Sequence, residues 1–414
     1  MADHAGRGEA FPDRLVEEDF SLRPILIPAF APAVLFGVAE GAVLPVVALT
    51  ARDLGGSLTV ASLVVALIGI GSLVSNIPSA LITTRYGERA AIIAAGGVAT
   101  AALLIALLAP DNLVLGLAML LVGFADAVFI LARQSYLSEV VPVHLRARAL
   151  STLGGSARIG IFIGPFVGAA AIQLAGTRSA YAVGAVAAAV AGLVAVFSPD
   201  LVTEADRRGP GHASVTVPMV LRSHRRVFLT LGLGVILVAA VRASRQVVLP
   251  LWAEHLGLSP AATSVIYGLA GAVDMAIFYP AGRVMDRRGR RWVAVPSMLI
   301  MGTALMLVSL TGAFATLVLA ALLLGFGNGI GSGMIMTLGA DNAPAIGRPA
   351  FLGIWRLLSD TGTCGGPVLL SGLTGVAGLT AAVVGNGLLG LLAAAALWYW
   401  IPRSASLARS ATPR

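Results

Sequence analysis

The sequence contains no lysine, and all 28 of its basic residues are arginine. A nucleotide-binding loop of the type G-x-x-x-x-G-K is therefore excluded. The single cysteine, Cys364, stands inside an apolar run, so a disulfide framework within the chain is excluded as well. The five histidines show no metal-ligand spacing, and no nucleophile–base set indicates an enzyme. Neither a metal nor a cofactor is expected.

Charged residues are also scarce. They make up 12% of the 414 residues, whereas a soluble domain has roughly a quarter. Hydrophobic residues make up 57%, and the 49 glycines and 21 prolines suit membrane helices, where small residues allow close helix contact. Residues 1–24 lack the apolar core of a signal peptide, so we expect a cytoplasmic tail there. This composition predicts an all-α membrane protein.

Twelve apolar runs are long enough to cross a hydrocarbon core, which takes about 20 helical residues. The predicted spans are 26–50, 58–82, 90–109, 113–136, 149–174, 180–198, 227–252, 261–283, 292–312, 314–339, 350–375 and 379–402. The polar stretch 199–226 predicts a cytoplasmic linker with a short surface helix. It divides the chain into six-helix bundles at 25–198 and 227–402, followed by a cytoplasmic tail at 403–414.

The arginines are unevenly distributed over the connections between the spans. If both termini share one side, that side carries 21 arginines, counting Arg283 at the very end of span 261–283 with its loop. The opposite loops carry two (Arg52 and Arg178), and five lie within spans. By the positive-inside rule, both termini are then cytoplasmic, in a multi-pass plasma (inner) membrane protein. The net charge of +8 therefore reflects topology, and no nucleic-acid partner is expected.

The two halves resemble each other at a fixed offset of 202 residues. The segment Gly123-Phe124-Ala125-Asp126 matches Gly325-Phe326-Gly327-Asn328, and Gly160, Gly164 and Pro165 match Gly362, Gly366 and Pro367. The first span favours an offset of 205, which aligns Val43-Leu44-Pro45 with Val248-Leu249-Pro250. Such a repeat predicts two pseudo-symmetric bundles with a substrate site between them.

One loop carries a family signature. Residues 282–291, G-R-V-M-D-R-R-G-R-R, resemble the G-x-x-x-D-R-x-G-R-R loop of the major facilitator superfamily, and the resemblance covers about 25–402. The matching residues are Gly282, Asp286, Arg287, Gly289, Arg290 and Arg291. The first-half loop keeps Arg85, Gly87 and Arg89, but it has Thr84 where the family has aspartate and Glu88 where it has arginine. This departure argues against the family's usual charge relay in the first-half loop.

Glycine patterns mark two further spans. Gly160, Gly164, Pro165 and Gly168 resemble the G-x-x-x-G-P-x-x-G motif of the drug/proton antiporter branch, although ordinary close helix packing also explains the glycines. Gly325, Gly329 and Gly333 fall on one helical face, which indicates close packing or a hinge.

Ionisable residues within the predicted spans are functional candidates, because a charge at the bilayer centre costs about 2.5–3.5 kcal/mol. They are Glu40, Asp126, Arg133, Arg158, Arg242, Arg245, Asp274, Arg356 and Asp360. In the fold that the chain resembles, spans 1, 4, 7 and 10 line a central cavity. The resemblance therefore places Glu40, Asp126, Arg133, Arg242, Arg245 and Asn328 there. The alternative for each residue is a structural ion pair, and for Arg356 and Asp360 a local pair four residues apart is favoured.

Three more specific expectations follow. Arg158 and Asp274 should form an ion pair between spans 5 and 8, because both lie deep in the membrane and each charge needs a partner. Glu40 should face Arg242 or Arg245 as an outer gate. Asp126, with an arginine such as Arg133 or Arg158 nearby, should be the residue at which substrate binding and protonation meet.

The resemblance implies a secondary active transporter that acts as a monomer on a small molecule and protons. We expect proton-coupled efflux (antiport) of an amphipathic or drug-like molecule by alternating access. A symporter or uniporter that imports a sugar or organic acid is the alternative within transport. A non-transporting receptor or scaffold is a third reading, against which the carboxylates of Glu40 and Asp126 weigh.

Overall fold

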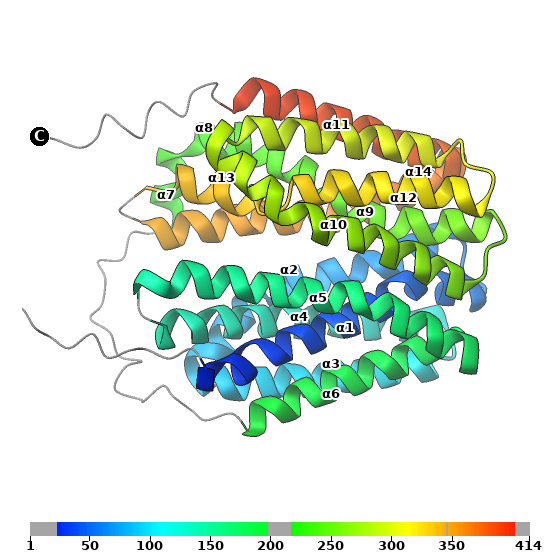
Figure 1. Ribbon diagram of the computed structural model, residues 1–414, viewed down its shortest axis with the longest axis horizontal. Coiled ribbons are helices and arrows are strands. Elements are labelled where there is room, and N and C mark those ends of the chain that lie inside the picture. Colours follow the sequence, from blue (N-terminus) through cyan, green and yellow to red (C-terminus); the bar gives the residue numbers. More distant parts are fainter. Residues whose placement is uncertain (1–22, 142, 198–216, 345–346, 402–414) are drawn as a thin grey trace, which may run out of the picture.

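The computed structural model describes residues 23–141, 143–197, 217–344 and 347–401, and this part of the chain is helical without strands. The helices lie side by side along the long axis of the molecule (Figure 1). The first half consists of α1 Arg23–Asp53, α2 Leu58–Tyr86, α3 Glu88–Leu108, α4 Asn112–Val140, α5 Val143–Ala175 and α6 Ser179–Phe197. The second half consists of α7 Val217–Ser223, α8 Arg225–Val227, the π-helical turn η1 Phe228–Gly232, α9 Leu233–His255, α10 Pro260–Arg288, α11 Arg291–Val308, α12 Phe314–Ile330, α13 Met334–Asn342 and α14 Arg348–Trp400.

Twelve membrane spans are present in this part of the chain, as the sequence predicts. Eleven helical segments are long and apolar enough to cross a membrane, and the segment Ala350–Trp400 contains two spans. The break in α14 is at Gly378, whose backbone is non-helical with φ of 82°. Only glycine adopts such a backbone readily. Gly176, 202 residues earlier, has the same φ of 82° and separates α5 from α6.

Other caps and turns repeat at the same interval. Ser57 caps α2 by accepting a hydrogen bond from Val60 N, and Ser259 caps α10 in the same way. Gly87 and Gly289 end α2 and α10 with φ of 83° and 95°. The pseudo-symmetry predicted from the sequence therefore extends to individual turn residues.

The spans differ from their predicted bounds in two respects. Several helices extend about one turn past the apolar run, for example α5, which begins at Val143, and α10, which ends at Arg288. The tenth span is not continuous, because Gly331–Gly333 separate α12 from α13 and Gly333 has a left-handed backbone. The predicted surface helix of the linker is α7. The tails 1–22 and 402–414 and most of the linker, 198–216, lie outside the described residues.

The offset of 205 for the first span is wrong. A Cβ on Gly160 would lie 2.0 Å from the carbonyl oxygen of Val34, and one on Gly362 would lie 2.2 Å from that of Ile236. Val34 and Ile236 are 202 residues apart, as are Gly160 and Gly362. The match between the two Val-Leu-Pro segments gave the wrong alignment, because three common apolar residues can match by chance. The glycines that contact the neighbouring helix backbone indicate the correct offset. Glu40 therefore corresponds to Arg242 and not to Arg245.

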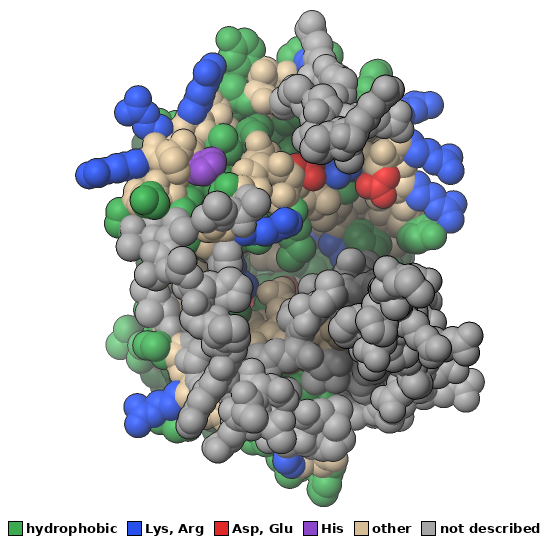
Figure 2. Space-filling view, turned by 90° about the vertical axis from the view of Figure 1, so that its left-hand side faces the viewer, with side chains coloured by type: hydrophobic (Ala, Val, Ile, Leu, Met, Phe, Trp, Pro, Cys, Tyr) green, Lys and Arg blue, Asp and Glu red, His purple; other side chains and the backbone are tan. Residues whose placement is uncertain are grey.

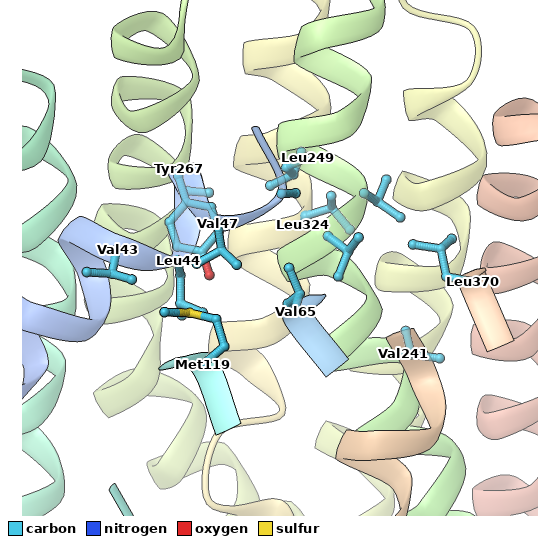
Figure 3. Packing of buried hydrophobic residues seen from close by; sticks show 14 of the residues in the cluster. Val43, Leu44, Val47, Val65, Met119, Val241, Leu249, Tyr267, Leu324 and Leu370 are labelled. Atoms are coloured by element: carbon cyan, nitrogen blue, oxygen red, sulfur yellow. The ribbon is translucent and has the colours of Figure 1, made fainter. Parts of the chain in front are cut away.

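The hydrophobic core joins the two halves. Buried side chains of α1, α2 and α4 belong to one cluster with those of α9, α10, α12 and α14 (Figure 3). Within each half, the first span packs against the fifth, so α1 contacts α5 and α9 contacts α14. Between the halves, α5 contacts α10 and α2 contacts α14.

The two ends of the bundle differ. The described chain ends, Arg23 and Ile401, lie at one end, here called the terminal end (Figure 1). At the opposite end, here called the far end, the connections between successive helices are three to five residues long. Connections this short leave little freedom for a loop to move independently of its helices.

Gly160→Ala is expected to lower the melting temperature of the purified protein. Its methyl group would collide with the backbone of α1, and overpacking of this kind costs about 1–3 kcal/mol. Gly154→Ala, on the same helix with nothing near the new methyl group, is the matched control and should be neutral or stabilising. Equal melting temperatures for the two variants, measured in detergent, would contradict this account of the contact.

Candidate functional site

A cavity of about 170 Å³ lies between the halves. Its walls are mostly apolar, and two carboxylates line it, Glu40 of α1 and Asp126 of α4. Glu40 is the only exposed side chain between Phe30 and Thr50, all of which are described, so it is open to a solvent-sized space inside the protein. From the second half, Ala243 and Gln246 of α9 and Thr363 and Pro367 of α14 complete the lining.

The guanidinium group that interacts with Asp126 is that of Arg356 in α14, and the nearby acid is Asp360. Arg356 Nε lies 3.7 Å from Asp360 Oδ2, so the pair expected at four residues' separation is present. Asp360 Oδ2 also accepts a hydrogen bond of 2.7 Å from Asn76 Nδ2 of α2. The pair is therefore part of a link between the halves, next to the cavity.

Arg158 of α5 lies 3.4 Å from Asp274 of α10, Nη1 to Oδ1, and the expected contact between spans 5 and 8 is present. The second carboxylate oxygen of Asp274 accepts a hydrogen bond of 2.8 Å from Asn328 Nδ2. Arg158 also donates to Ser332 Oγ and lies over the ring of Phe278. Ser332 is in the break between α12 and α13, so the discontinuous tenth span supplies a hydrogen-bond acceptor to Arg158.

The two arginines of α9, Arg242 and Arg245, are not among the residues that line the cavity, although Ala243 and Gln246 of the same helix are. Arg242 interacts electrostatically with Asp274, Arg158 and Arg245. Gly331 makes room for it, since a Cβ there would lie 2.6 Å from Arg242 Nη2. Among the described residues, no ion pair joins Glu40 to Arg242 or Arg245. The expected contact of Glu40 with an α9 arginine is therefore absent from this structure, although other contacts close the far end.

Arg133 is placed differently from the expectation. It is buried, packs near the ring of Phe129 and is not among the residues that line the cavity. Its separation of seven residues from Asp126 gives the same approximate helix face, but one face of a long helix spans several environments. Asn328 likewise contacts Asp274 instead of the cavity.

At the far end, other polar contacts join the halves. Arg52 Nε lies 2.9 Å from Glu254 Oε1, and Ser371 Oγ donates to the carbonyl oxygen of Thr59 at 2.9 Å. Arg52 and Glu254 are 202 residues apart, so pseudo-symmetric positions carry opposite charges and meet. The terminal end is hollowed between the two halves (Figure 2). The structure is closed at the far end and more open at the terminal end.

The two signature loops make different contacts. In the second half, Arg290 lies 2.8 Å from Asp341 and 3.3 Å from Asp286, and the hydrogen bond to Asp341 raises the pKa of this guanidinium. In the first half, the equivalent position is Glu88, which is buried and accepts a hydrogen bond of 3.1 Å from Ser135. Arg290 of the second loop thus contacts two carboxylates, whereas among the described residues Glu88 of the first loop accepts from a neutral hydroxyl group, that of Ser135.

The glycines of the span-5 motif are in contact with the backbone of α1. A Cβ on Gly164 would lie 2.5 Å from the carbonyl oxygen of Val38, and the equivalent Gly366 meets Ala240 at 2.1 Å. The same contact in both halves is what helix packing requires. These glycines therefore have a structural role in the fold, whichever way the protein moves its substrate.

Sequence reasoning missed Asn76, Ser332 and the pair Arg52–Glu254. Asn76 stood out only as a polar side chain near the end of an apolar run, and Ser332 was hidden among glycines. The signal for Arg52 and Glu254 was present, since opposite charges occur at exactly corresponding ends of two related spans.

Two six-helix halves that pack around a mostly apolar cavity lined by two carboxylates are typical of membrane transporters. The family description Major Facilitator Superfamily matches residues 30–345 and, again, residues 231–414. The chain belongs to the major facilitator superfamily, and the fold predicted from the sequence is confirmed.

The proteins to which this chain is similar include transporters of different substrate classes. The chain is 27% identical over 286 residues to the multidrug resistance protein MdtH of Klebsiella pneumoniae (strain 342), which covers 67% of this chain and 68% of the relative. The nucleoside transporter NupG has a similar structure, with a TM-score of 0.74, 13% identity and coverage of 91% of this chain and 99% of its own. A D-xylose–proton symporter gives a TM-score of 0.69 at 17% identity and covers 92% of this chain and 98% of its own. At these identities the two structures show the fold alone.

Proposed function

We propose that the protein exports a small amphipathic molecule across the plasma membrane in exchange for protons. The observation that carries this proposal is the pair of carboxylates, Glu40 and Asp126, in an otherwise apolar cavity between the halves. Such groups are costly within a membrane and are typical of proton and substrate pathways. The similarity to a multidrug resistance protein supports efflux.

The mechanism is alternating access of the two halves. The arginine distribution supports a cytoplasmic terminal end, and with this orientation the structure corresponds to an inward-facing state with its far end closed. In this state Asp126 binds substrate from the cytoplasm and releases its proton. After the halves rock, a proton from the far side displaces the substrate.

Reconstitution into liposomes with an imposed pH gradient tests the proposal. With the lumen acidic, a fluorescent amphipathic dye should accumulate against its gradient, and a protonophore should abolish this accumulation. A panel of dyes, sugars and nucleosides run in both gradient directions separates antiport from symport. Uptake of a sugar together with protons would replace the proposal by the import alternative, for which the similar structure of a D-xylose–proton symporter is the supporting observation.

Loss of the far-end ion pair is expected to favour the outward-facing state. Arg52→Gln removes a pair whose side chains are 34% and 32% exposed. Such a pair is worth about 0.2–1 kcal/mol, so far-end opening should rise by about 1.4- to fivefold. The reporter is the rate at which a cysteine at Thr59, in a Cys364→Ala background, reacts with an impermeant maleimide from the far side. Arg178→Gln is the control, because Arg178 bonds within its own half. Equal labelling rates in the two variants would show that the pair does not hold this end closed.

A further inference from the structure

Charge is unevenly distributed across the centre of the molecule. The wall formed by the first half presents Glu40 and Asp126 to the cavity. Arg242 and Arg245 of the second half are not themselves among the lining residues, but they belong to α9, the helix whose Ala243 and Gln246 line the same cavity. Arg242 is one helical turn before Gln246, and side chains four residues apart share a helix face.

The one acid close to Arg242 is already occupied. Asp274 accepts from Arg158 with one carboxylate oxygen and from Asn328 with the other. Arg242 also interacts with the guanidinium groups of Arg158 and Arg245, so in the described chain the charges near Arg242 are two further cations and this single carboxylate. The surroundings of Arg242 in the second half therefore have an excess of positive charge.

This excess is accompanied by unused hydrogen-bond donors. Nε and Nη2 of Arg242 and Nε of Arg245 are buried and have no hydrogen-bond partner in the described part of the chain. Leaving a buried donor unpaired costs about 1–3 kcal/mol, and more for a charged group. Glu40 does not supply the partner, because it forms no ion pair with either arginine. In the described part of the chain, these donors of Arg242 and Arg245 therefore lack a hydrogen-bond acceptor.

Apart from the two carboxylates, the cavity is lined mostly by apolar side chains. Phe36, Val43, Leu44, Val65 and Leu103 line it, and these side chains suit a hydrocarbon or aromatic body. A molecule that fills the space and balances both walls has a cationic end, an apolar middle and an anionic end.

We propose that the cavity takes an amphoteric molecule, with its ammonium group at Glu40 and Asp126 and its carboxylate at Arg242 and Arg245. This inference rests on the proposed function and names its substrate class. A simple lipophilic cation would neutralise the first-half wall but leave the α9 arginines unpaired, and a simple anion would do the reverse. A zwitterion pairs both sets without adding net charge to the membrane interior.

Four versions of one compound test this. Naphthylalanine is zwitterionic, its methyl ester is a cation, its N-acetyl derivative is an anion, and the N-acetyl methyl ester is neutral. Binding to the purified protein in nanodiscs is measured by naphthyl fluorescence and by calorimetry. The zwitterion should bind at least about tenfold more tightly than each of the other three, because each neutralised end leaves buried charge without a partner.

Variants assign the two ends. Arg242→Gln should weaken the zwitterion to the level of the methyl ester and leave the ester's affinity unchanged. Glu40→Gln should remove the zwitterion's advantage over the N-acetyl derivative. Arg178→Gln, an arginine outside the cavity, is the control. If a variant does not fold, the relative affinities of the unaltered protein for the four compounds still test whether the cavity prefers a zwitterion.

Three results would overturn the inference: tighter binding of the ester, tighter binding of the N-acetyl derivative, or no binding of any of the four. Proton-driven flux of the ester alone would leave the proposed antiport intact and show that the substrate is a plain cation. Failure of every compound and dye to move in a pH gradient would instead remove the proposed function itself.

Discussion

Asp126→Asn is expected to abolish proton-driven transport and to weaken substrate binding without abolishing it, because Glu40 still lines the cavity. Asparagine keeps the shape of the side chain and a hydrogen-bonding oxygen, but it cannot bind and release a proton near neutral pH. The repeat supplies a precedent, since Asn328 occupies the equivalent position of the second half and bonds to Asp274. Gradient-driven flux in proteoliposomes should fall to background, and substrate-induced proton release from detergent-solubilised protein should disappear.

Asp111→Asn is the matched control for this experiment. Asp111 caps the same helix by accepting a hydrogen bond from Val114 N, and asparagine is an equally good N-cap. Proton-coupled transport at unaltered stoichiometry in Asp126→Asn would mean that Asp126 is not the coupling residue. Glu40→Gln would then be tested in the same assay, as the other carboxylate that lines the cavity.

Removal of Asp274 is expected to destabilise the protein more than removal of Arg158. Breaking a buried ion pair by deleting one partner costs about 3–5 kcal/mol, because a charge is left unpaired. Asp274→Asn leaves Arg158 without its carboxylate and also deprives Arg242 of its favourable interaction. Arg158→Gln leaves Asp274 in contact with Asn328 and near Arg242.

Thermal unfolding in detergent checks this order, and the double variant completes the cycle. Arg158→Gln with Asp274→Asn should lose less stability than the sum of the single variants, because the two amides can bond to each other. Additive losses, or a greater loss in Arg158→Gln than in Asp274→Asn, would show that the contact does not contribute as the geometry indicates.

The fold could be predicted because its determinants are local in the sequence. Apolar runs of the required length, the 202-residue repeat and the arginine-rich connections specify twelve spans in two halves. The pair Arg158–Asp274 was also accessible, because depth along a helix follows from residue counting. The same counting failed for Arg133, since it gives depth and an approximate face but not which neighbour covers that face.

Contacts between the halves were harder to predict. The hydrogen bond from Asn76 to Asp360 joins residues 284 positions apart, and neither spacing nor motif indicates it. The break at Gly331–Gly333 was anticipated only as a hinge or a packing face, because glycine serves both purposes. The register of the first span was misjudged because an apolar match was given the same weight as the glycines that touch the neighbouring backbone.

The short connections at the far end have a kinetic consequence under the proposed mechanism. Turns of three to five residues cannot fold aside as a flap, so a path to the outside can open only when whole helices tilt together. Rigid-body motions of this size take microseconds to milliseconds and displace the surrounding lipid. Turnover should therefore respond to the thickness and fluidity of the bilayer. A change of lipid chain length should alter the transport rate without altering the affinity of the cavity for its substrate.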